Sequence, residues 1–439
     1  MARTTTRTIV LMLAPFALLA TTAPEAAAGK ATTRRADVTN DGAEAGSAIY
    51  ESISGDGRFV AFETVSQLVG SDTDTNTDVY VRDLRARTTE RMSVRSNGAA
   101  ANGDSGYAAI SANGRFVSFW SEATNLVPRD DNAHQDVFVH DRRTGATTLV
   151  SVSSRERQAN GDSSGSAISA NGRYIAFGSA ATNLVKHDSN GYDDLFVRDT
   201  ETGTTTRVTV SSSGRQADAG VGFPAPGMIS ADGRFVVFDS VATNLVKQDS
   251  NGVRDVFVHD VRTGRTVRAS VDGRERQANA GSGASAISAT GRFVSFASDA
   301  SNLVRHDENP VSDVFVRDLR SGKTQRVSVS SSEVEGDDAS GYSSISATGR
   351  FVAFDSNAEN LIASDTNTAS DIFLRDRERG KTRRVSVSRT REQGNGYSQL
   401  PYLSADGAFV TFQSEATNLV PNDTNATTDV FVRGPLIST

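Results

Sequence analysis

One pattern recurs seven times along this chain, and it constrains the fold more strongly than any other feature. Its first copy, residues 53–60, reads Ile-Ser-Gly-Asp-Gly-Arg-Phe-Val. Each copy is followed by an Asn-Leu element, by a segment such as 136–139 (Asp-Val-Phe-Val), by a Thr-Gly turn and by one more apolar segment. The copies begin 57 to 61 residues apart, at Ile53, Ile110, Ile168, Ile229, Ile287, Ile345 and Leu403. Self-similarity at a nearly fixed period predicts a repeat architecture.

Each repeat predicts four short strands. In the second repeat these are the small-residue stretch 107–111 and the β-branched and aromatic runs 116–119, 137–139 and 149–152. A tight Ala-Asn-Gly turn separates the first two, and its glycine supplies a positive φ. No useful length of chain shows a helical period of 3.6 residues. Four-stranded antiparallel units in tandem predict an all-β fold, a single seven-bladed β-propeller.

The two ends of the chain complement each other. The seventh repeat stops after 430–433 (Val-Phe-Val-Arg), so its fourth strand is missing. Residues 33–38 resemble 381–387 and lie at the right distance before Ile53 to supply that strand. We therefore predict that the N-terminal strand completes blade seven, which closes the ring and hides two sheet edges that would otherwise invite aggregation. An open solenoid with a ragged end is the alternative.

Two blocks carry a resemblance to a known family. The Ser-x-Asp-Gly-Arg-Phe-Val-x-Phe block and the Asp-Val-Phe-Val-Arg-Asp block resemble TolB-like repeats, a WD-repeat-like class of bacterial propellers, over roughly residues 32–434. The resemblance implies a propeller that serves as a binding platform, a scaffold or occasionally an enzyme. The chain leaves no room for the α/β domain of TolB itself, so a TolB role in outer-membrane maintenance is not implied. The proline usual before Asp-Gly is also replaced, by Gly55, Ala112, Ala170, Ala231, Ala289, Ala347 and Ala405.

The first residues predict export. Residues 1–28 combine a basic start, a short apolar run and small residues at 26–28, which is the layout of a secretory signal peptide. The propeller is then expected over 29–439, in a protein that is secreted, or periplasmic or extracellular, after removal of the signal. The 439 residues include 46 Lys and Arg, 53 Asp and Glu and no Cys. This acidic balance gives no electrostatic reason to bind nucleic acid, and no second apolar segment predicts membrane insertion. We expect a monomer.

Charged residues that recur in every blade are expected to be structural. An arginine opens the second strand of six repeats and an aspartate closes the third, and antiparallel pairing places these ends side by side. Both are lost together in the seventh repeat, at Ala408 and Gly434. We predict six ion pairs within the blades: Arg58–Asp83, Arg115–Asp141, Arg173–Asp199, Arg234–Asp260, Arg292–Asp318 and Arg350–Asp376.

Loops on one face carry the chemically suggestive pattern Asp-x-Asn-x-x-x-Asp. It occurs six times, for example at Asp130, Asn132 and Asp136, and again in the copies at 188–194, 249–255, 307–313, 365–371 and 423–429. Alternating hard oxygen ligands suit Ca²⁺, and the richer first copy is the best metal candidate: Asp72, Asp74, Asn76 and Asp78. The alternative is that these side chains bond the loop backbone in Asx turns.

The same face is expected to carry the function, because it receives the long loops, such as 121–135 and 153–165. Departures from the repeat mark binding candidates: Trp120, the sole tryptophan, which could instead pack in the core, and the insertion with Phe223 and Pro224, which could line the ring entrance.

No nucleophile–base pair or phosphate-cradling glycine loop is recognisable, so no catalytic or cofactor-binding residue is assigned. We therefore predict a binding or scaffolding module for a protein or glycan ligand, with Ca²⁺ as the candidate cofactor. The alternative is a propeller enzyme, a polysaccharide lyase or hydrolase with carboxylates at the ring entrance and metal assistance. A purely structural surface protein is a third hypothesis.

Overall fold

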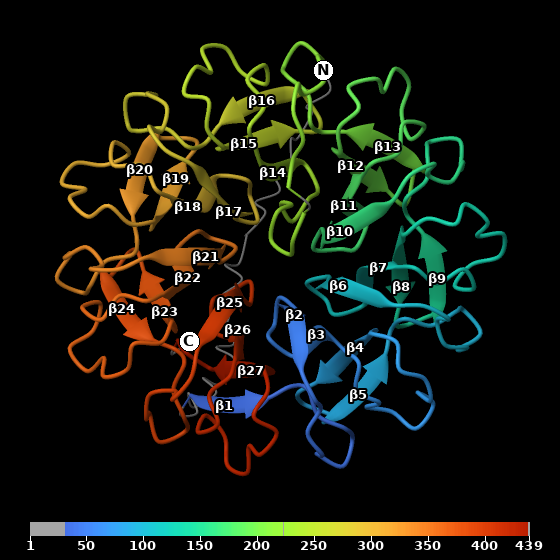
Figure 1. Cartoon of the computed structure of the whole chain (residues 1–439), viewed down its shortest axis with the longest axis horizontal. Helices are drawn as coiled ribbons and strands as arrows, with labels where there is room; N and C mark the ends of the chain where they lie inside the picture. Colours follow the sequence, from blue (N-terminus) through green and yellow to red (C-terminus); the bar gives the residue numbers. More distant parts are fainter. Residues whose placement is uncertain (1–30, 223, 438–439) are drawn as a thin grey trace, which may run out of the picture.

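The computed structural model describes residues 31–222 and 224–437, and it folds these residues into a ring of seven antiparallel sheets (Figure 1). No helix occurs among the described residues, and hence none that could span a membrane. The fold predicted from the repeats is confirmed: a seven-bladed β-propeller. The predicted signal peptide, 1–28, lies outside the described residues.

Blade one contains β2 (Ala48–Ile53), β3 (Phe59–Thr64), β4 (Asp78–Asp83) and β5 (Thr88–Arg91). Blade two contains β6 (Ser105–Ile110), β7 (Phe116–Ser121), β8 (Asp136–Asp141) and β9 (Ala146–Leu149). Blade three contains β10 (Ser163–Ile168), β11 (Tyr174–Ser179), β12 (Asp194–Asp199) and β13 (Thr204–Arg207). Blade four contains β14 (Phe235–Ser240), β15 (Asp255–Asp260) and β16 (Arg265–Arg268).

Blade five contains β17 (Ser282–Ile287), β18 (Phe293–Ser298), β19 (Asp313–Asp318) and β20 (Lys323–Arg326). Blade six contains β21 (Ser340–Ile345), β22 (Phe351–Ser356), β23 (Asp371–Asp376) and β24 (Lys381–Arg384). Blade seven contains β25 (Ser398–Leu403), β26 (Val410–Ser414), β27 (Asp429–Gly434) and β1 (Thr32–Arg35). The first strand of each complete blade lies nearest the centre of the ring (Figure 1).

The N-terminal strand closes the ring, as the complementary chain ends predict. β1 pairs antiparallel with β27, in a register that runs from Thr32 opposite Gly434 to Arg35 opposite Phe431. Figure 1 shows the first and last strands side by side at the outer edge of blade seven. Buried apolar residues of blade one, including Phe62, also pack with Val430 and Val432 of blade seven. The open solenoid is therefore excluded.

Blade four departs from the predicted four strands. Its innermost segment forms only two isolated bridges, Val221 with Ser240 and Ile229 with Val236, instead of a continuous strand. The insertion carries Pro224 and Pro226, which have no N–H to give to a strand ladder. The sequence expectation of a regular first strand was wrong for this one blade, and the physical reason is the prolines.

A closed circle of backbone hydrogen bonds joins all seven blades at the turn between their first two strands. Each turn donates one N–H to the carbonyl of the next blade, and the distances are 2.8 to 3.2 Å. The circle runs through Gly55, Ala112, Ala170, Ala231, Ala289, Ala347 and Ala405, and returns to Gly55. These are the positions at which the TolB-like repeats carry proline, a residue that cannot donate. The glycine and the six alanines of this chain keep these donors.

The six predicted ion pairs all form, with Nη2-to-carboxylate distances of 2.5 to 2.7 Å. In each, the guanidinium also lies over the aromatic ring that follows it, for example 4.6 Å from Arg58 to the centroid of Phe59. The hydrogen bond from Arg173 lowers the pKa of Asp199 to about 2. These arginines hold the ends of the second and third strands together, as the repetition indicated.

Candidate functional site

A central pocket of about 350 Å³ opens among the innermost strands. Four tyrosines from blades one, two, six and seven line it: Tyr50, Tyr107, Tyr342 and Tyr402. The remaining wall comes from Ala225, Pro226, Met228, Ala284, Ser285, Ser343, Gln399, Leu400 and Pro401. Tyr50 and Tyr107 lie three residues before Ile53 and Ile110, where their strands enter the tight turns. They are therefore nearer the opposite ends of these strands, and the pocket lies toward the face that carries the long loops.

A bulge in each innermost strand aims these side chains into the channel. The pairing of β2 with β3 shifts register between Ile49 and Ser52, and the other complete blades show the same shift. The bulge forces a left-handed backbone on Tyr50 (φ 52°), Tyr107 (φ 49°) and Leu400 (φ 54°). This conformation is unfavourable for residues with a Cβ, and such strain clusters at binding and catalytic sites.

Carboxyl groups of the neighbouring blades hold two of the bulges in place. Glu63 accepts a hydrogen bond of 2.5 Å from the backbone N–H of Tyr107. Asp355 accepts one of 3.2 Å from that of Leu400. Both acids occupy the last position but one of a blade's second strand, and this position varies around the ring: Glu63, Trp120, Gly178, Asp239, Ala297, Asp355 and Gln413.

A third carboxyl group, Glu51, lies directly after Tyr50 and is fully buried. Its Oε2 accepts a hydrogen bond of 3.0 Å from Gln413, and its Oε1 has no partner. Burial raises the pKa of Glu51 to about 8, that of Glu63 to about 7 and that of Asp355 to about 7. All three groups therefore change charge close to neutral pH.

The pocket wall offers aromatic rings, hydroxyl groups and one amide. The rings of Tyr50 and Tyr107 are stacked, with 4.1 Å between their centroids. None of the described lining residues carries a charge, because the acids lie behind the wall and bond its backbone. An arrangement of this kind can hold a ligand by stacking and hydrogen bonding. A carboxyl that acts as general acid or base must reach its substrate directly or through one water.

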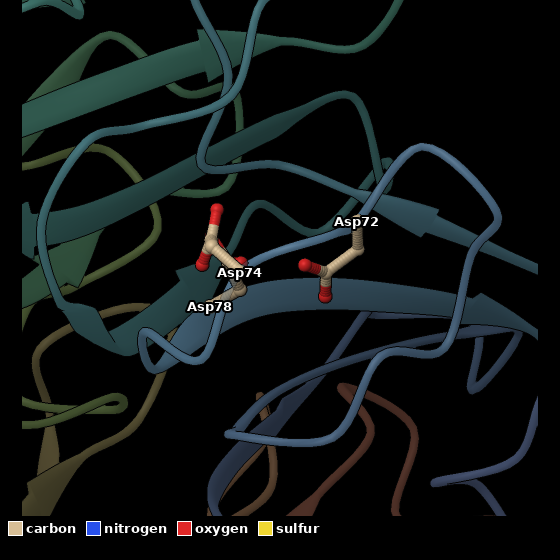
Figure 2. Close-up of side chains that lie close together, drawn as sticks. All are labelled: Asp72, Asp74 and Asp78. Carbon is tan, nitrogen blue, oxygen red and sulfur yellow. The ribbon is translucent and has the colours of Figure 1, made fainter.

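The predicted metal residues of blade one do come together. Figure 2 shows Asp72, Asp74 and Asp78, which offer carboxylate oxygens within 4.8 Å of one another. Nη1 of Arg91 lies 3.2 Å from Asp72 and 3.0 Å from Asp78, so a guanidinium already stands between these carboxylates. The backbone N–H of Asn76 donates to Asp74 in an Asx turn. A metal ion could use this oxygen set only after Arg91 moved away.

The equivalent loops repeat this arrangement and favour the Asx-turn interpretation. In blade three, Nη1 of Arg207 lies 2.9 Å from both Asp188 and Asp194. Asn190 caps the same loop by donating to Asp194 and to the carbonyl of Ala217. Six blades have this arginine, at Arg91, Arg207, Arg268, Arg326, Arg384 and, from β1, Arg35. Blade two has Leu149 in its place.

The other predicted binding residues have separate positions. Trp120 lies in β7 opposite Gly106 and packs against the apolar cluster between blades two and three. It is not among the described residues that line the pocket. Pro224 is buried, and Ala225 and Pro226 of the same insertion line the pocket. Phe223 lies outside the described residues.

Sequence reasoning missed the four tyrosines and the acids behind them. One signal was present: the first strand varies between repeats while its neighbours do not, and three of its variants place a tyrosine at the same point, Tyr50, Tyr107 and Tyr342. The bulge that turns these side chains into the channel has no local sequence signature.

Comparison with known proteins bears on the fold alone. No protein-family model and no curated protein matches the chain. It is similar to an oligogalacturonate lyase from Vibrio parahaemolyticus, with TM-score 0.52 and 11% identity over 89% of this chain and 90% of that one. The β-propeller domain of the Trilobed protease from Pyrococcus furiosus, described as an open velcro topology, aligns with TM-score 0.53 and 10% identity over 89% and 93%. A putative TolB from Agrobacterium tumefaciens aligns with TM-score 0.39 and 16% identity over 64% and 80%.

Proposed function

We propose that this protein is an exported binding module that takes a glycan into the tyrosine-lined pocket on its long-loop face. The single observation that carries the proposal is the convergence of Tyr50, Tyr107, Tyr342 and Tyr402 on one pocket. Sugar rings have apolar C–H faces that stack on aromatic rings and hydroxyl groups that hydrogen-bond to phenols, so tyrosine serves both ends of the contact.

The size and strain of the pocket support binding. A volume of about 350 Å³ lies near the lower end of the range for small-ligand sites, roughly 300–1,000 Å³, and suits the end of a chain. The left-handed backbone of Tyr50 and Tyr107 is maintained at a cost to folding. A purely structural ring could avoid this cost by using glycine, which adopts a left-handed backbone without strain, as Gly165 does at the same bulge of blade three.

Binding is favoured over catalysis by the position of the acids. Glu63 and Asp355 are 5% and 7% exposed and accept backbone hydrogen bonds from behind the pocket wall. In that position neither can transfer a proton to a ligand in the pocket. The chain is similar in fold to an oligogalacturonate lyase. However, no arginine or lysine occurs among the described residues that line the pocket, so the pocket offers no cation to an acidic oligogalacturonate.

The test is a glycan array followed by calorimetry on the chain without residues 1–28. We expect saturable binding to a glycan, weakened at least about tenfold, or about 1.4 kcal/mol, by Tyr342→Ala. Tyr342 is 54% exposed, so its truncation should leave the fold intact. The matched control is Tyr192→Ala, which removes a 48% exposed tyrosine from a long loop outside the pocket. Equal binding by the two variants, or binding of no glycan, would refute the proposal.

A further inference from the structure

The acids behind the pocket differ from most other buried acids of the ring in having no cationic partner; among the described buried acids, only Asp37 and Asp136 share this lack of an ion pair. Among the described residues, neither Glu51, Glu63 nor Asp355 forms an ion pair, although they are 0%, 5% and 7% exposed. Asp239, at the position of Glu63 in blade four, pairs with Arg254. The loop acids of six blades pair with an arginine, as at Arg207. A buried carboxylate without a counter-ion is unfavourable. Asp136 accepts hydrogen bonds from Asn132 and Ser151, and Asp37 faces Asp429, whereas the three acids behind the pocket adjoin an open space.

All three acids touch or adjoin residues that form the pocket wall. Glu63 holds the amide of Tyr107, Asp355 holds the amide of Leu400, and Glu51 follows Tyr50 in the chain. They come from blades one and six and therefore approach the pocket from different sides. When they are ionised, their negative potential acts inside the pocket, where burial reduces screening by solvent.

The tyrosines add a second attraction for positive charge. The face of an aromatic ring is the negative end of its quadrupole, and a cation over such a face gains about 0.5–2 kcal/mol. The stacked pair Tyr50–Tyr107 and the rings of Tyr342 and Tyr402 surround one space. No arginine, lysine or histidine occurs among its described lining residues, so that space holds no cation of the chain.

We infer that the ligand group that enters the pocket is a cationic ammonium, so that the glycan of the proposed function is an amino sugar whose nitrogen is not acylated. That the ligand is a glycan rests on the proposed function. That the ligand is positively charged rests on the tyrosines and the unpaired acids. A neutral sugar would leave the three acids without a counter-ion. A uronate would add a negative charge beside them.

Calorimetry with three tetrasaccharides tests this: the β-1,4-linked glucosamine tetramer, its fully N-acetylated form and cellotetraose. We expect the free amine to bind at least about tenfold more tightly than either neutral tetramer. Tetramethylammonium, a permanent cation without a sugar, should compete for the same site. Oligogalacturonate of equal length should not bind.

Two isosteric variants give the control for the acids. In Glu63→Gln and Asp355→Asn an amide oxygen still accepts the backbone hydrogen bond, so the bulges are kept. Combined, they should lower the ratio of amine to acetylated affinity at least about threefold, while Glu51 and the tyrosine rings retain the rest of it. Persistence of the full ratio in this double variant would overturn the inference.

The remaining outcomes separate the inference from the proposed function. If neutral and amine tetramers bind equally, or the uronate binds best, the charge inference fails and the glycan module stands. If tetramethylammonium binds in the pocket and no sugar does, the glycan module fails and the charge inference stands.

Discussion

The backbone N–H of Ala405 donates to the carbonyl of Gly55 at 3.0 Å, and this bond joins the last turn of the ring to the first. It completes a circle in which seven neighbouring turns each donate once and accept once. Two sets of contacts therefore close the ring: the hydrogen bond from Ala405 to Gly55 near its centre, and the pairing of β1 with β27 at its outer edge. The centre of the ring is thereby fixed, and the bulged strands that carry the tyrosines start from a rigid frame.

Proline at one position of this circle should weaken the fold. Ala231→Pro removes the N–H that donates to Ala289 and leaves that carbonyl without its partner. We expect the free energy of unfolding to fall by about 1–3 kcal/mol, as measured by urea denaturation. Ala231→Gly keeps the donor, as Gly55 does in blade one, and should cost less than the proline variant. Proline and glycine variants of equal stability would contradict the role of the circle.

Restoring the missing arginine in blade two should stabilise the protein. At Leu149, the equivalent of Arg207, no guanidinium separates Asp130 from Asp136, and burial together with Asp136 raises the pKa of Asp130 to about 6. Leu149→Arg should therefore raise the melting temperature at pH 7 and lower the pKa of Asp130.

The reverse change, Arg207→Leu, leaves two facing carboxylates in blade three and should lower the free energy of unfolding by about 3 kcal/mol. Thermal unfolding measured at pH 5 and at pH 7 checks both variants. If Leu149→Arg destabilises the chain, the equivalence of the two positions is wrong.

The N-terminal closure should weaken as the pH rises. In the other six blades a serine or threonine hydroxyl donates to the aspartate that begins the third strand, as Ser270 does to Asp255. In blade seven that position is Asp37, which is fully buried and faces Asp429; Arg35 lies beside both, and Asp423 lies beside Asp429 and Arg35. Burial and Asp429 raise the pKa of Asp37 well above its usual value. Its protonated form can take the place of the hydroxyl donor.

A raised pKa in the folded state means that this contribution is complete below the unfolded pKa, about 3.9, and is lost as the pH rises through the folded pKa. Asp37→Ser restores the hydroxyl of the other blades and should remove the loss. We expect the stability difference between Asp37→Ser and the parent chain to grow with pH in denaturant titrations. A difference that is constant with pH would contradict a shared proton.

Affinity for a permanent cation should rise with pH. Glu63 faces Tyr107 and Asp104, and Asp355 faces the amides of Gly341, Tyr342 and Leu400. Each has a pKa of about 7, so each is mostly neutral at pH 6 and mostly ionised at pH 8. Tetramethylammonium should therefore bind more tightly at pH 8, and the Glu63→Gln, Asp355→Asn double variant should lose the part of this dependence that Glu51 does not supply. Affinities that are equal at both pH values in the parent chain would contradict the part given to the acids.

The ring could be predicted from sequence because every blade repeats the evidence for it. The equivalents of Arg58 and Asp83 occur together in five more repeats and are both absent in the seventh, at Ala408 and Gly434. This joint occurrence indicated that the two residues form a pair. Within one blade, Pro224 and Pro226 were visible as an insertion, but their effect on the innermost strand depends on how the insertion meets β14.

The candidate site was not predictable in the same way, because it consists of what the repeats do not share. Three of the four tyrosines, Tyr50, Tyr107 and Tyr342, lie in bulges, which arise from the pairing of a blade's first two strands and leave no mark in the sequence of either strand. The loop carboxylates suggested a metal site because the arginine that pairs with them lies in another strand, away from the loop motif in the sequence. Its recurrence in six repeats, and its replacement by Leu149, was the signal that could have found it.

The most direct test is a crystal structure of residues 29–439 with the glucosamine tetramer. We predict one sugar in the central pocket, with its ammonium nitrogen in the space that the stacked Tyr50–Tyr107 pair shares with Tyr342 and Tyr402. Ligand density on the outer loops, or an empty pocket in crystals whose ligand is bound elsewhere, would contradict it.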